Sequence, residues 1–210
     1  MANTFSAFGF RSFGRQEGGS PTAGMTKLNL LSSDTNTYFT GDVVTISSES
    51  LVAGYITDPS SGTTTGSPIW GIFNGCEYYS PDVARVVWSP YFPGSVGSSS
   101  PCNAYVLTDP EQLFTVQCTT TAVVGTSAIG LNVGYASSLQ TSGNTTTGIS
   151  ALALNSSTVS ANSSLPFRIV DTTSNFAPPG VNGTDGSTTG AIVVVQMNNS
   201  ARRSLTGPST

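Results

Sequence analysis

The sequence predicts an all-β protein: a single β-sandwich or barrel of jelly-roll type, with an extended N-terminal arm and long polar loops. Short runs rich in β-branched and aromatic residues recur along the chain, and Gly, Pro, Asn and Ser separate them, as in sandwiches and barrels. No window keeps the i, i+3, i+4 apolar spacing over a full helix. The 23 glycines, 12 prolines and charged fraction of only 9% fit strands joined by polar loops.

Residues 1–26 are expected to form the arm. Four phenylalanines alternate irregularly with glycines and arginines, and the segment has neither a helical nor a clean strand period. Such a segment can lie extended on a neighbouring protein, although a disordered terminus is the alternative. The candidate interface residues are Phe5, Phe8, Phe10, Arg11, Phe13 and Arg15.

Residues 27–200 are expected to form the β domain, and residues 201–210 a flexible tail. Two polar loops, 58–67 and 94–101, separate groups of strands, and Thr108–Gln112 could form one helical turn. The remaining expected strands are 28–31, 38–40, 43–46, 51–57, 104–107, 113–118, 128–135, 149–154, 165–170 and 190–197.

The stretch 68–94 contains both tryptophans and is the densest in large apolar side chains. It predicts strands over 69–73 and 84–88, joined by a connection over 74–82. We expect it to form the core, together with strand 113–118; the alternative is an exposed aromatic platform built on Tyr78, Tyr79 or Tyr91. The candidate core residues are Trp70, Phe73, Val86, Trp88, Phe114 and Val116.

Charge is unevenly distributed along the chain. Residues 1–27 carry a net charge of +2, residues 28–184 carry −7, and residues 185–210 carry +1. The acidic body would repel nucleic acid, whereas basic ends could dock on an acidic protein surface. The longest aliphatic run, near 191–195, is far too short to span a membrane, and the first residues lack the apolar region of a signal peptide.

The residues give little support for catalysis. The chain has no histidine, and none of its serines lies in a recognised nucleophile motif. Three widely spaced cysteines, Cys76, Cys102 and Cys118, predict reduced, unligated thiols rather than a disulfide framework or a metal site. Asp34 and Asn36 predict an Asx turn more readily than a calcium site. We therefore expect no enzymatic activity, no cofactor and no metal.

Several short motifs follow one another along the chain. The chain opens on a short segment with a Gly9-Phe10-Arg11 centre, and a Tyr-x-x-Gly-Asp-x-Val segment follows at 38–44. An Asp-Pro-x-x-x-Phe-x-Val-Gln segment lies at 109–117. The further pieces are SPIWGIFNGCEYY, IGLNVGY, TTTGIS, LPFRIVD and AIVVVQMNN. In their order along the chain, these motifs resemble a family of small structural proteins of tailed-bacteriophage heads. The lengths of the two polar loops depart from the family pattern.

The resemblance implies a decoration or cement protein on the outer surface of a virion capsid, made in the cytoplasm of the bacterial host. Its implied partners are the major capsid protein and neighbouring copies of itself, with no nucleic acid or membrane. Many weak contacts would add up on a lattice. The resemblance carries over no catalytic residue. The alternative function is a receptor- or carbohydrate-binding β module of a virion fibre.

Overall fold

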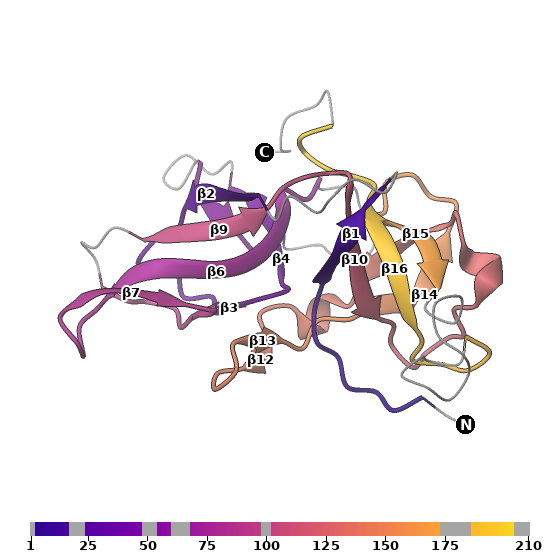
Figure 1. Ribbon diagram of the computed structural model, residues 1–210, viewed down its shortest axis with the longest axis horizontal. Helices are drawn as coiled ribbons and strands as arrows, with labels where there is room; N and C mark the ends of the chain where they lie inside the picture. The colour runs from indigo at the N-terminus through magenta and orange to yellow at the C-terminus, as the bar shows by residue number, and fades with distance from the viewer. Residues whose placement is uncertain are drawn as a thin grey trace.

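The computed structural model describes residues 3–16, 24–47, 54–59, 68–97, 102–172 and 186–203. Over these residues the protein is all-β, as predicted, and the pairings between its named strands are antiparallel. Two six-stranded sheets lie toward opposite ends of an elongated molecule (Figure 1). Most of the two expected polar loops lies outside the described residues, namely 60–67 and 98–101. The expected tail is described only as far as residue 203.

The first sheet, here the β10 sheet, has the strand order β1-β10-β16-β15-β11-β14. Its alternating apolar residues face inward, as in a half-buried antiparallel sheet. The strands are β1 (Arg11–Arg15), β10 (Gln112–Gln117), β16 (Ile192–Met197), β15 (Phe167–Thr172), β11 (Asn132–Tyr135) and β14 (Leu154–Ser160).

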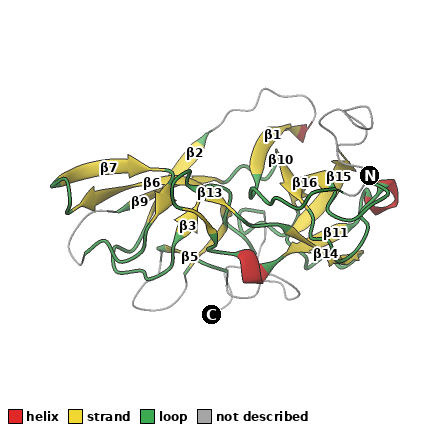
Figure 2. Ribbon diagram, turned by 90° about the horizontal axis from the view of Figure 1, so that it is seen from below, coloured by secondary structure: helices red, strands yellow, loops and turns green. Residues whose placement is uncertain are grey.

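The second sheet, here the β6 sheet, has the order β2-β9-β6-β4-β5, and β7 pairs with β6 in addition. Its strands are β2 (Met25–Asn29), β9 (Asn103–Leu107), β6 (Gly71–Ser80), β4 (Val43–Ile46), β5 (Ile56–Thr57) and β7 (Arg85–Ser89). Two small pairs, β3 (Tyr38–Phe39) with β8 (Tyr91–Phe92) and β12 (Gly143–Asn144) with β13 (Ile149–Ser150), complete the strands of the described residues. Figure 2 marks β3 and β13 of these pairs. Short 3-10 turns occupy Thr126–Ala128 and Ser137–Leu139.

The two sheets share one hydrophobic core, which confirms the predicted sandwich. Val43, Ile72 and Leu107 of the β6 sheet join Phe114 and Val116 of the β10 sheet in the larger buried cluster. Of the described strands, those at the ends of each sheet stay apart, so neither sheet closes into the barrel that was the other possibility.

A second buried cluster covers the opposite face of the β6 sheet. Phe73 of β6, Val106 of β9 and Phe92 of β8 belong to it, and Tyr38 packs against both aromatic rings. The second cluster therefore covers one face of the β6 sheet as far as the half-buried Tyr78, whereas residues of the other face join the core shared with the β10 sheet only at the inner end.

The N-terminal segment differs from the expected arm. Residues 11–15 are an edge strand of the β10 sheet, and the Phe10 ring is 2% exposed. That ring stacks on Phe167 at 4.3 Å and meets Phe114 edge-on at 6.3 Å. Residues 3–16 are thus part of the domain, because their central aromatic side chain fills its core rather than a neighbour's pocket.

A tightly packed junction fixes this segment to the body. The Phe10 amide donates to the Gly41 carbonyl (3.0 Å), and the Gly9 amide donates to the Leu152 carbonyl (3.1 Å). Gly41 has φ +104°, and a Cβ there would lie 2.9 Å from the Phe10 nitrogen, so only glycine fits. The buried Asp42 carboxylate accepts hydrogen bonds from the Phe39 amide (2.8 Å) and the Ser150 hydroxyl (2.5 Å).

Most expected strands are present with shifted ends, and two expectations were wrong. The predicted connection 74–82 is not a connection, because β6 continues to Ser80 and forms a hairpin with β7. The predicted helical turn at 108–112 is a tight turn between β9 and β10, held by the Gln112 amide donating to the Asp109 carbonyl. Of the expected strand 51–57, residues 54–57 lie among the described residues, and there β5 covers Ile56–Thr57.

Candidate functional site

The outer half of the β6 sheet leaves one face open to solvent, and we call this surface the open face. Directly paired residues share a face of an antiparallel sheet, and successive residues alternate between faces. The pairs Glu77–Trp88 and Tyr79–Val86 therefore lie on one side of the β6–β7 hairpin, away from the second cluster. The open face comprises Met25, Lys27, Glu77, Tyr79, Val86, Trp88 and Tyr105.

Two residues expected in the core lie on this face instead. Trp88 is 60% exposed and Val86 is 56% exposed, so their assignment to the core was wrong. The physical reason is that β7 has apolar side chains on both faces, and only Val87, opposite Tyr78, points toward the second cluster. Of the other expected core residues, Phe73, Phe114 and Val116 are fully buried, and Trp70 is half-buried.

A backbone irregularity supports the Trp88 ring. The register between β6 and β9 shifts between Phe73 and Cys76, which is typical of a bulge. Gly75, inside this bulge, has φ +125°, and a Cβ there would lie 2.8 Å from the Trp88 ring. The indole therefore packs directly against the backbone of Gly75, which leaves no room for a larger residue there.

The polar groups of the open face largely satisfy one another. Lys27 Nζ and Glu77 Oε2 form an exposed ion pair at 3.7 Å. A hydrogen bond to Glu77 raises the pKa of the Tyr105 hydroxyl. A neutral centre flanked by an exposed tryptophan and valine is typical of a protein-binding surface, in which aromatic residues are enriched and unpaired charges are depleted.

The alternative hypothesis of an exposed aromatic platform predicted an aromatic surface here, but only one of its three candidate residues lies on it. Tyr79 lies on the open face, whereas Tyr78 packs edge-on against Phe92 at 6.1 Å and Tyr91 stacks on Phe39 at 5.6 Å. Trp88 and Tyr105 were missed as platform residues. Glu77 and Tyr79 are two residues apart, so they would share one face of a strand. They could have indicated the exposed face of β6 if the predicted strand had continued past residue 73.

The N-terminal interface candidates are distributed between core and surface. Phe10 is buried in the chain's own core, so it is not available to a partner. Phe5 and Phe13 are 42% and 48% exposed, and Phe8 is half-buried. The Arg11 Nε donates to the Phe8 carbonyl at 3.2 Å, and burial lowers the pKa of the Arg11 guanidinium.

The two basic ends of the chain converge on the β9–β10 turn. Arg15 Nε pairs with Asp109 Oδ2 at 2.9 Å, and Arg203 pairs with Glu111. Asp109 and Glu111 belong to the acidic body, so much of the basic charge of both ends is neutralised within the chain. This pairing weakens the expectation that the ends dock on an acidic partner.

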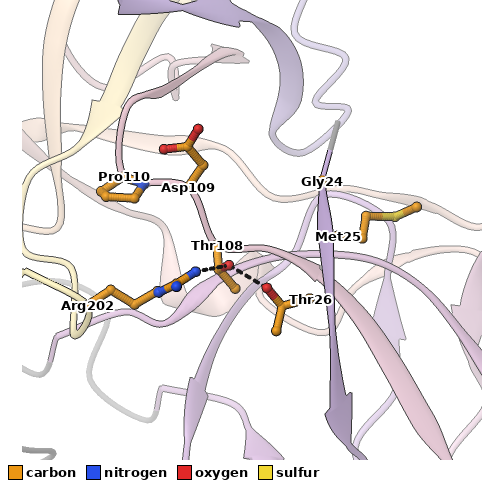
Figure 3. Close-up of a pocket in the computed structure, with 7 residues that line it drawn as sticks. All are labelled: Gly24, Met25, Thr26, Thr108, Asp109, Pro110 and Arg202. Atoms are coloured by element: carbon orange, nitrogen blue, oxygen red, sulfur yellow. Dashed lines mark hydrogen bonds between the residues drawn. The ribbon is translucent and has the colours of Figure 1, made fainter. Parts of the chain in front are cut away.

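A pocket of about 530 Å³ opens beside this turn (Figure 3). Arg202 Nη1 donates to Thr108 Oγ1 (2.5 Å), which lies 2.8 Å from Thr26 Oγ1. Asp109 and Pro110 also line the pocket and lie above Thr108 and Arg202 in Figure 3. The pocket is shallow and of mixed charge, and its polar groups already bind one another, so its geometry indicates no particular ligand.

Several ionisable groups elsewhere are buried, and burial shifts their pKa values. The three cysteines are free and buried, and burial raises the pKa of the Cys102 thiol to about 11 and of Cys118 to about 12. Burial likewise raises the pKa of Asp42 to about 7. The Asn36 amide donates to Asp34 Oδ1 at 2.9 Å, which is the predicted Asx turn.

Two negative findings apply to the described residues. They contain no group of three or more His, Cys, Asp or Glu side chains that could hold a metal ion. None of their helices has the length and apolar character needed to cross a membrane.

Comparison of the chain with protein-family models, curated proteins and solved structures gives no match.

Proposed function

We propose that the protein is a virion structural protein, a capsid decoration or cement protein that binds the major capsid protein through its open face. The observation that carries the proposal is the exposure of Trp88 (60%), Val86 (56%) and Met25 (47%) on one side of a rigid sheet. Burying such apolar area on a partner provides on the order of 25 cal/mol per Å². The ordered motif resemblance supports the choice of a capsid as the partner.

A decoration role suits the other properties of the molecule. It requires a rigid scaffold and a contact surface but no active site, and the paired Lys27 and Glu77 leave the centre of the open face without net charge. Many copies on a lattice gain strength from multivalency, so each contact can be modest. The protein would be made in the host cytoplasm and located on the outer surface of the capsid.

The test is co-sedimentation with capsids from which the native copy has been stripped. Replacing one buried aromatic anchor at an interface typically costs about 2 kcal/mol or more, so Trp88→Ala should lower the affinity at least about tenfold. Val123→Ala is the matched control, because Val123 is 55% exposed but belongs to a segment that pairs with Thr189, away from the β6 sheet. Equal binding of Trp88→Ala and the control would reject the open face as the contact.

A second variant separates the open face from the N-terminal segment. Phe5 is 42% exposed and lies in the segment first expected to be an interface arm. If Phe5→Ala weakens capsid binding and Trp88→Ala does not, the contact lies on residues 3–16.

The second candidate function is a receptor- or carbohydrate-binding module of a virion fibre. The observation that favours it is the presence of exposed Trp88 and half-buried Tyr79 on the same face of the β6–β7 hairpin, since aromatic faces also bind sugar rings. Binding of the isolated protein to host cells or glycans, lost in Trp88→Ala, together with no binding to capsids, would support this function instead.

A further inference from the structure

Strand β7 is an edge strand with little protection against pairing. In the described part of the chain its ladder is with β6 alone, so its outer edge presents unpaired N–H and C=O groups. Edge strands are usually protected by several charges, by bulges or by internal proline. Arg85 is the single charge of β7, and Pro90 comes only after its last residue.

The position of β7 makes this edge accessible. The β6–β7 hairpin forms the far end of the molecule along its long axis, away from the β10 sheet, in both views (Figures 1 and 2). A second molecule can therefore approach the edge without meeting the β10 sheet.

We propose that two copies of the chain pair through antiparallel β7 strands about a two-fold axis at Val87. In this register Val87 lies opposite its own copy, and Val86 of each chain lies opposite Trp88 of the other. Aromatic and β-branched residues are favourable cross-strand partners. The contact is isologous, because the same five residues serve both copies.

Three features identify a second copy as the occupant. The strand RVVWS is complementary to itself in this register. Each Arg85 lies opposite Ser89 of the other copy, so the two cations are at opposite ends of the contact. Finally, paired residues share a face, so the two open faces join into one continuous surface carrying both Trp88 rings.

The inference does not require the proposed capsid role, because the isolated protein tests it. Opposed residues have Cα atoms about 4.5–5.5 Å apart, within the roughly 4.4–6.8 Å that a disulfide spans. A Val87→Cys variant should therefore form a disulfide-linked dimer under mild oxidation. Arg85→Cys is the matched control, because four residues at about 3.3 Å each separate the two copies of position 85. The unmodified protein measures the background of cross-linking, because its three native cysteines are buried.

A charge-exchange experiment tests the register. The double variant Val86→Lys/Trp88→Lys places like charges opposite each other, as does Val86→Glu/Trp88→Glu. Each alone should dissociate at least tenfold more readily than the unmodified protein in sedimentation velocity, whereas an equimolar mixture should form a heterodimer. The proposal is overturned if the unmodified protein is monomeric at every concentration in sedimentation velocity. It is also overturned if either double variant dimerises as strongly as the unmodified protein, or if Arg85→Cys cross-links as fast as Val87→Cys.

Discussion

Replacing Phe10 by alanine should destabilise the whole domain, although Phe10 is only ten residues from the start of the chain. Its ring is 2% exposed, stacks on Phe167 at 4.3 Å and meets Phe114 edge-on at 6.3 Å. Truncating a buried phenylalanine costs about 3–5 kcal/mol, because the transfer free energy is lost and a cavity remains. We expect a loss of that size in the free energy of unfolding.

The assay is equilibrium denaturation in urea, followed by far-ultraviolet circular dichroism. The midpoint should fall while the slope stays constant, since the area exposed on unfolding hardly changes. Phe5→Ala is the matched control: the same substitution in the same segment at a residue 42% exposed, with an expected loss within about 0.5 kcal/mol.

A direct comparison of these two variants decides between a core segment and an independent arm. If residues 3–16 were an arm, Phe10→Ala and Phe5→Ala would both leave the stability of the body unchanged. A loss below about 1 kcal/mol for Phe10→Ala would therefore refute the packing described here.

Three further predictions follow from the same structure. Trp88→Ala should cost less than about 1 kcal/mol of stability, measured by the same denaturation, because the side chain is 60% exposed. The folded-state pKa of Asp42 is about 7, above its ordinary value of 3.8. The contribution of this group to stability is therefore greatest below about pH 4 and is lost as the pH rises through 7. The urea midpoint should accordingly fall as the pH rises over this range, and Asp42→Asn should reduce that fall. Because burial raises the pKa of all three thiols, Ellman's reagent should find them protected in the native protein and count three after unfolding; a thiol count of one would reveal a disulfide.

The strand content was predictable because it depends on local composition. Runs such as 43–46 and 104–107 are short, apolar and bounded by turn residues, and they became β4 and part of β9. The ends of β6 were not predictable, because Gly75 in its middle was taken to end the strand. The glycine instead permits a bulge under the Trp88 ring, which is a contact between two strands rather than a local preference.

Burial was predictable only in strands whose apolar and polar residues alternate. Strand β10 alternates apolar and polar residues, and its Phe114 and Val116 are fully buried as expected. In β7 the run Val86-Val87-Trp88 has no alternation, so hydrophobicity could not indicate which side chains face solvent. The wrong placement of Trp88 followed from assigning the whole apolar-rich stretch 68–94 to the core.

The motifs that carry the family resemblance meet in space. Gly9 and Phe10 contact Gly41, and Asp42 of the Tyr-x-x-Gly-Asp-x-Val segment binds Ser150, the last residue of TTTGIS. These residues hold the N-terminal segment against the two sheets, so they account for the fold. Because these residues make internal contacts, they identify no binding surface, and the open face had to be found from the structure.

A cryo-electron microscopy reconstruction of stripped capsids reloaded with the protein would show directly whether the open face binds a capsid. We expect added density on the outer surface into which the domain fits with Trp88 and Val86 facing the major capsid protein. Density in which the open face points to solvent, or capsids that stay bare at saturating protein, would contradict it.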